Sequence, residues 1–218
     1  MALLIPINTL SKSETFGGLT YQVKGELVPM LQIELELKPI YFLQHSLVWK
    51  DPQVQVSPKI LKEEFNRIVG NKPSFMVQAK GIGSIALSCD APGKIFTIPL
   101  KAFESFDVKD NQFVAASDNV EYSFTKLQKV SDFFVGAKAT YIDNFLCKQG
   151  EGIVWLYGKG NVFEFNLKEG EQIDLEHSRW IYKNKSVKME ISEDNHLILN
   201  RFTGPGRVGI QTLESFNA

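Results

Sequence analysis

The sequence contains few of the residues on which cofactor and metal sites depend. Among its 218 residues there are only two cysteines, Cys89 and Cys147, and they lie far apart. Two isolated cysteines are too few for a disulfide framework or a cysteine metal site. They favour a reducing, intracellular compartment, and we expect no cofactor.

An excess of charge of one sign is also absent. The 24 Lys and Arg residues nearly balance the 25 Asp and Glu residues, so the formal net charge at pH 7 is −1. Nucleic acids and anionic membranes attract basic patches. The composition therefore gives no electrostatic reason to expect nucleic acid as a partner.

Long apolar runs are missing as well, and none approaches the length that crosses a bilayer. The first residues, Met1 to Ile7, are apolar but lack a basic region, and Pro6 interrupts them before they reach the length of a signal peptide. We expect a single domain, residues 1–218, without a membrane span and located in the cytoplasm.

What the sequence does contain is an internal repeat. Residues 93–120 align without a gap onto residues 160–187. The identical pairs are Gly93/Gly160, Phe96/Phe163, Leu100/Leu167, Lys101/Lys168, Glu104/Glu171, Asp107/Asp174 and Val120/Val187. A weaker copy lies upstream, where Met30, Ile33, Leu35, Tyr41, Leu43 and Val48 match Ile95, Ile98, Leu100, Phe106, Val108 and Phe113. Such repeats indicate an architecture built from one repeated unit.

In each copy, apolar residues occupy every second position, as in Ile98-x-Leu100. This period is typical of strands with one buried face. Four or five charged or glycine residues separate two such strands, which suits a hairpin loop, and a third short strand follows. Three tandem β-hairpin repeats, at roughly 20–56, 75–145 and 146–218, predict an all-β fold. It is either a closed body with approximate threefold symmetry or a two-sheet sandwich.

One segment breaks the strand pattern. Ser57 suits a helix cap, Pro58 suits the first turn, and Gly70 suits the position after the last turn. The apolar residues between them share one helical face. We expect a short amphipathic helix at 58–69, which either covers an open end of the β body or docks a partner.

The motif Gly-x-Gly occurs at Gly81–Gly83, Gly158–Gly160 and Gly204–Gly206. Closely spaced glycines can cradle a phosphate when a helix begins just after them. Here strand-like residues follow instead. The glycines therefore indicate bulges or corners where backbones come close together.

Aromatic residues offer a possible stacking surface for single-stranded RNA. The candidates are Trp49, Trp155, Tyr157, Trp180, Tyr182 and Phe202. Most of them alternate with polar residues in strand phase, which is typical of a protein core.

Catalytic motifs are nearly absent. Of the three histidines, His45 and His177 lie at corresponding places in two copies, so they could bind a metal near a common axis or simply occupy equivalent surface turns. The sequence has no closely spaced histidine pair, no nucleophile elbow and no clustered acid pair. We therefore predict no catalytic, cofactor-binding or metal-binding residues and no enzymatic activity.

Several motifs, in their order along the chain, resemble a known family. They are Trp49-Lys50-Asp51, Phe75 with Gly81–Ile85, Pro92–Ile95, Phe113–Ala115 with Val120, and Gly204–Val208 with Ile210–Thr212. This pattern resembles the prokaryotic, uncharacterised branch of the altered-inheritance-of-mitochondria family of mitochondrial biogenesis proteins. The resemblance implies a fold similar to that of the tryptophan RNA-binding attenuation protein (TRAP), a double-stranded β-helix-like body that tends to form homo-oligomers. It carries no catalytic residues over.

These observations predict a non-catalytic scaffold or interaction protein that works as a homo-oligomer, with a trimer favoured and an unknown protein partner. Two alternatives stay open. One is a TRAP-like binder of a small ligand or single-stranded RNA, and the other is a metal-dependent enzyme that uses His45 and His177.

Overall fold

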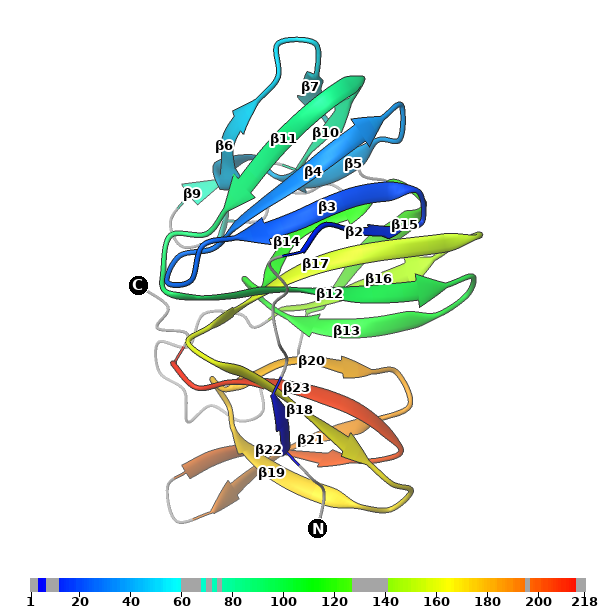
Figure 1. Ribbon diagram of the computed structural model, residues 1–218. Coiled ribbons are helices and arrows are strands. Elements are labelled where there is room, and N and C mark those ends of the chain that lie inside the picture. Colours follow the sequence, from blue (N-terminus) through cyan, green and yellow to red (C-terminus); the bar gives the residue numbers. More distant parts are fainter. Residues whose placement is uncertain are drawn as a thin grey trace.

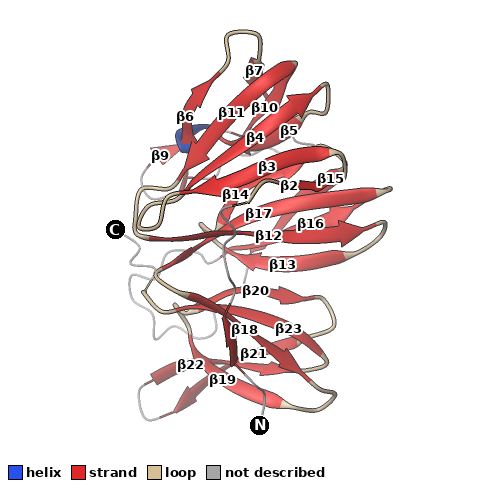
Figure 2. Cartoon of the chain, viewed as in Figure 1, coloured by secondary structure: helices blue, strands red, loops and turns tan. Residues whose placement is uncertain are grey.

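The computed structural model describes residues 4–6, 12–59, 68–69, 72–73, 76–126, 141–194 and 197–214. Strands make up most of this part of the chain, and its one helical element is a single 3-10 turn, η1 (Gln44–Ser46) (Figure 2). The predicted all-β fold class is confirmed.

Eighteen of the strands form three sets of six. The first set is β4 (Met30–Glu36), β5 (Ile40–Leu43), β6 (Leu47–Lys50), β7 (Gln55–Pro58), β10 (Met76–Lys80) and β11 (Ile82–Ser88). The second is β12 (Gly93–Lys101), β13 (Ser105–Lys109), β14 (Phe113–Ser117), β15 (Val120–Lys126), β16 (Tyr141–Cys147) and β17 (Glu151–Lys159). The third is β18 (Val162–Leu167), β19 (Gln172–Glu176), β20 (Trp180–Asn184), β21 (Lys188–Asp194), β22 (Leu197–Thr203) and β23 (Gly206–Gln211).

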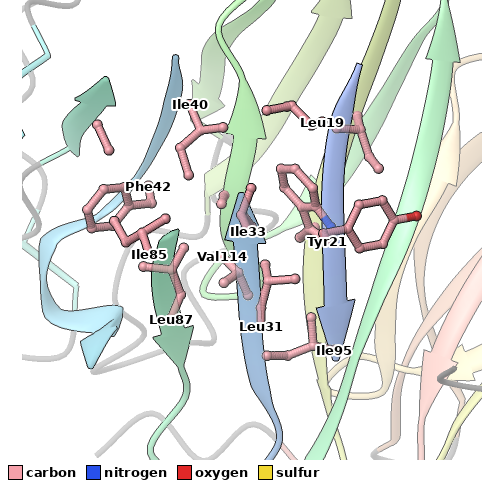
Figure 3. Packing of buried hydrophobic residues seen from close by; sticks show 14 of the residues in the cluster. Leu19, Tyr21, Leu31, Ile33, Ile40, Phe42, Ile85, Leu87, Ile95 and Val114 are labelled. Carbon is pink, nitrogen blue, oxygen red and sulfur yellow. The ribbon is translucent and has the colours of Figure 1, made fainter. Parts of the chain in front are cut away.

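All three sets have the same pairing. In each, the sixth strand lies between the first and the third, as in β4-β11-β6, and the fifth lies between the second and the fourth, as in β5-β10-β7. Each set thus consists of two half-sheets. Ile33 and Ile85 from one half-sheet of the first set and Phe42 from the other belong to the same buried cluster (Figure 3).

The sets are stacked and joined by their sheets. The first set lies at the top of Figure 1, the second in the middle and the third at the bottom. Strand β5 pairs with β14 of the next set, and β13 pairs with β20, both antiparallel. These two junctions produce a six-stranded and a seven-stranded sheet.

The remaining strands extend the sheets at their edges. Strands β2 (Glu14–Phe16) and β3 (Leu19–Lys24) add to β4 and complete a five-stranded sheet, and β1 (Leu4–Pro6) adds to β18. Strands β8 (Ile68–Val69) and β9 (Lys72–Pro73) pair with each other. The second half-sheet of the third set, β19-β22-β21, is a sheet by itself.

The predicted hairpins are wrong. The two strands that the sequence suggested as a hairpin lie in different sheets in every set: β4 and β5, β12 and β13, and β18 and β19. The connection is a tight turn that crosses between sheets. Its shape explains the identity of Glu104 and Glu171 in the repeat, because their carboxylates accept the backbone N–H of Lys101 and Lys168 at 2.8 and 3.0 Å.

The predicted helix at 58–69 is wrong at both ends. Pro58 ends β7, where it pairs with Val77, and Ile68–Val69 forms β8. Residues 60–67 lie outside the described residues. The cap-like sequence Ser57-Pro58 instead completes an edge strand, where proline is tolerated because it needs no ladder partner on its open side.

Glycines at the start of each sixth strand make room for a valine. The pairs are Gly83 with Val54, Gly152 with Val120 and Gly206 with Val187, and all three valines are 1% exposed. A Cβ on Gly152 would lie 2.6 Å from Cγ2 of Val120. The corner interpretation therefore holds for Gly81–Gly83 and Gly204–Gly206. In the second set the equivalent position is Gly150–Gly152. Gly158–Gly160 lies at the turn from β17 to β18, where Gly160 has φ of +71°, so the corner interpretation holds there as well.

Candidate functional site

The junction between the second and third sets contains a buried ion pair. Lys183 of β20 lies directly opposite Asp107 of β13, with Lys183 Nζ 2.8 Å from Asp107 Oδ2, and each side chain is only 9% exposed. Lys185 Nζ contacts the other carboxylate oxygen, and Asn144 Nδ2 donates to it at 2.5 Å. Burial raises the pKa of Asp107, but the hydrogen bonds from the two lysines outweigh it and leave that pKa below its usual value.

The junction between the first and second sets is apolar instead. Ala115 and Ala116 of β14 lie opposite Phe42 and Tyr41 of β5, and all four residues are fully buried. Small side chains on one strand therefore face large rings on the other. The two junctions share the pairing of strands but not its chemistry.

The third strand of every set has the same local structure. Its pairing with the sixth strand skips one residue near its start, after Leu47 in β6, Phe113 in β14 and Trp180 in β20. At its end, the side chain of Ser117 in β14, of Asn184 in β20, or of Asp51 directly after β6 accepts a backbone N–H of the sixth strand. These two landmarks make Lys50 the structural equivalent of Ala116 and Lys183.

In β6 this third strand is exposed. Val48 is 54% exposed and Trp49 is 38% exposed. Their equivalents are Val114 and Ala115 in β14, and Ile181 and Tyr182 in β20, all of them 0% exposed. Among the strands that the structure describes, β6 pairs with β11 alone. The surface that the other two sets cover with a neighbouring half-sheet is therefore without a covering half-sheet in the first set, as far as the described residues go.

The complementary surface is open in the third set. Strand β19 corresponds to β5 and β13, yet within the described part of the chain it pairs with β22 alone. Its Asp174 is the repeat equivalent of Asp107, and Arg201 holds it with two hydrogen bonds of 2.8 and 2.7 Å. These bonds lower the pKa of Asp174.

The two histidines suggested for a metal lie in different sets. His45 is exposed in η1, whereas His177 is half-buried in the turn after β19, where its Nδ1 lies 3.2 Å from Asn200 Oδ1. Burial lowers the pKa of His177. Among the described residues, no three His, Cys, Asp or Glu side chains form a group that could hold a metal ion.

Lys109, beside His177, is a buried lysine, and its burial disfavours the charged form of its ammonium group. Its Nζ donates to the His177 carbonyl at 2.8 Å, and burial lowers its pKa from 10.5 to about 8. The charged groups around it are Glu176, Asp110 and Lys159. Between pH 8 and 10.5 the unfolded chain binds a proton there that the folded chain does not, so stability contributed at this site rises with pH.

We expect the free energy of unfolding of the wild type, relative to that of Lys109→Met, to increase from pH 8 to pH 10.5. Urea titrations of both proteins across this range measure the difference. Other groups titrate equally in both proteins, so they cancel. If the difference in unfolding free energy between the two proteins did not change with pH, the pKa of Lys109 would not be lowered by burial.

The aromatic residues weighed for RNA stacking are largely inaccessible. Trp155, Tyr157, Trp180, Tyr182 and Phe202 are at most 4% exposed, and only Trp49 of the six reaches the surface. Bases cannot stack on rings that are buried in the cores. Their placement agrees with the strand-phase interpretation of these residues.

Comparison with known proteins gives a family and a fold. The family described as mitochondrial biogenesis AIM24 matches residues 21–213. A crystal structure of a Streptococcus pyogenes protein has a TM-score of 0.69 at 18% identity, covering 90% of this chain and 94% of the other, which shows the same fold. No curated protein matches the chain. Within the described residues, no helix is long and apolar enough to cross a membrane. Since the family match spans most of its length, the chain belongs to the mitochondrial biogenesis AIM24 family.

Proposed function

We propose that this chain is a non-catalytic scaffold that works as a cytoplasmic homo-oligomer, with a trimer favoured. The supporting observation is the exposure of Val48 and Trp49 on β6, at positions that are fully buried in both other sets. An open strand edge with apolar side chains is a template for pairing with another chain. A repeated assembly would present one surface several times to a protein partner.

Native mass spectrometry of the purified protein tests this proposal. We expect one oligomer at the bare polypeptide mass, because a scaffold needs no bound group. Extra mass of a metal or small molecule on each subunit would contradict the simple scaffold and favour a ligand-binding or enzymatic role. Nucleic acid that leaves steeply with salt would favour the RNA-binding alternative.

A charge on the open edge should dissociate the oligomer. We expect Val48→Glu to weaken self-association at least about tenfold, since association would bury an unpaired carboxylate. Ile82→Glu is the matched control, because Ile82 is 59% exposed in the same sheet but on the interior strand β11, which has a neighbour on both sides. If both variants dissociated equally, or if neither dissociated, the β6 edge would not be the surface through which copies associate.

A further inference from the structure

We infer that a second copy of this chain docks head to tail, by pairing β6 of one copy with β19 of the next. This inference rests on the proposed homo-oligomer and names its contact. Within the chain, a third strand joins a second strand at two places, β14 to β5 and β20 to β13. Two strands of these kinds take part in neither junction: β6, the third strand of the first set, and β19, the second strand of the third set. By the same rule, each is the type of strand that would pair with the other.

Two of the sheets contain one half-sheet fewer than the others. The six- and seven-stranded sheets each contain two half-sheets, whereas the five-stranded sheet with β6 and the three-stranded sheet with β19 each contain one. Pairing β6 with β19 of another copy would join these into a continuous sheet like the other two. The contact extends a junction that the chain already makes twice.

The register of this contact follows from the landmarks of the third strand. In β20, Lys183 lies opposite Asp107. Lys50 is the equivalent of Lys183, and Asp174 is the equivalent of Asp107. Antiparallel pairing in the same register therefore places Lys50 of one copy opposite Asp174 of the next, with Trp49 opposite Leu175.

The charges fit this register. Asp107 is surrounded by two cations, Lys183 and Lys185. Asp174 has one cation beside it, Arg201, and Lys50 would be the second. A lysine on an open edge can also prevent unwanted pairing. Here Lys183 shows that a lysine at this position is compatible with a fully formed junction.

The contact uses two different surfaces, so it leaves a free copy of each surface at the two ends of any open chain of subunits. A defined mass requires closure into a ring. This geometry excludes a two-fold dimer built from β6 against β6.

Cysteine cross-linking tests the contact. Opposite Cα atoms in an antiparallel pair lie about 4.5–5.5 Å apart, within the range that a disulfide spans. We expect the Lys50→Cys/Asp174→Cys variant to form a ladder of disulfide-linked oligomers under mild oxidation, seen on non-reducing gels. The wild type, with Cys89 and Cys147, gives the background. The shifted pair Lys50→Cys/Gln172→Cys should give at least about tenfold less product, since its diagonal separation of about 7–8 Å is too long.

Three outcomes would overturn the inference. Cross-linking of Lys50→Cys alone would show that β6 pairs with itself. Equal ladders from the matched and shifted pairs would show that the register is wrong. An oligomer by native mass spectrometry without any ladder would refute this contact while the scaffold proposal stands, whereas a monomer at all concentrations would refute both.

Discussion

Asp107→Ala is expected to lower the free energy of unfolding by about 3–5 kcal/mol, the range for breaking a buried ion pair. The variant leaves the buried Lys183 ammonium without the carboxylate 2.8 Å away. Asp174→Ala is the matched control at the equivalent position. In a single copy its pair with Arg201 is exposed to solvent, where ion pairs contribute little, so we expect a much smaller change when unfolding is measured at a concentration where copies do not associate.

Urea unfolding of the two variants beside the wild type measures this contrast. Because the folded-state pKa of Asp107 is lowered, its contribution is fully present above the pKa of an unfolded aspartate. It is lost as the pH falls toward the lower folded-state pKa, so the gap between wild type and Asp107→Ala should narrow in acid. Similar losses for Asp107→Ala and Asp174→Ala would show that burial of the junction does not control its energetics.

Gly206→Ala is expected to lower the free energy of unfolding by about 2–5 kcal/mol, through backbone strain and overpacking together. Gly206 has φ of +136°, a conformation that residues with a side chain rarely adopt. A Cβ there would also lie 2.8 Å from Cγ2 of the buried Val187. Both effects act on the same residue, so the loss should be large.

Gly170→Ala separates these two effects in the same set. Gly170 also has a positive φ, +73°, but a Cβ there would meet nothing within 4 Å. We expect a loss of about 1–2 kcal/mol, from the left-handed backbone alone. Thermal unfolding of both variants provides the comparison. A smaller loss for Gly206→Ala than for Gly170→Ala would mean that Val187 moves aside at little cost.

The sequence located individual strands better than it located their partners. The alternation in Ile98-x-Leu100 correctly predicts a strand, because it depends only on which face is buried. It does not reveal whether the next strand pairs within the same sheet or crosses to another, since both have the same period. The hairpin prediction failed for this reason.

The helix prediction failed for a different reason. Ser57-Pro58 has local features of a helix start, but tertiary pairing decides the conformation, and Pro58 pairs with Val77 in β7. Local propensity is weaker than a complete set of strand contacts.

The sequence identified only the acidic residues of the candidate contact. Asp107 and Asp174 were identified as identical positions of the repeat. Their basic partners were not. The sequence alignment places Val48 at Phe113, whereas the strand pairing places Leu47 there, so Lys50 falls one position away from its structural equivalent Lys183. Exposure of Val48 and Trp49 likewise required the three sets to be compared in space.

The sequence by itself determined that the chain is all-β and that its apolar and turn residues recur. Both features depend only on residues close together in the sequence: the alternation of buried and exposed positions and the Lys-x-x-Glu turns. Only the tertiary structure decided how the copies connect. Which strand edges pair and which stay open depends on contacts between residues far apart in sequence. Asp107 and Lys183 form a buried pair, whereas their equivalents Asp174 and Lys50 lie on open strands, so the same local pattern can occur in either state.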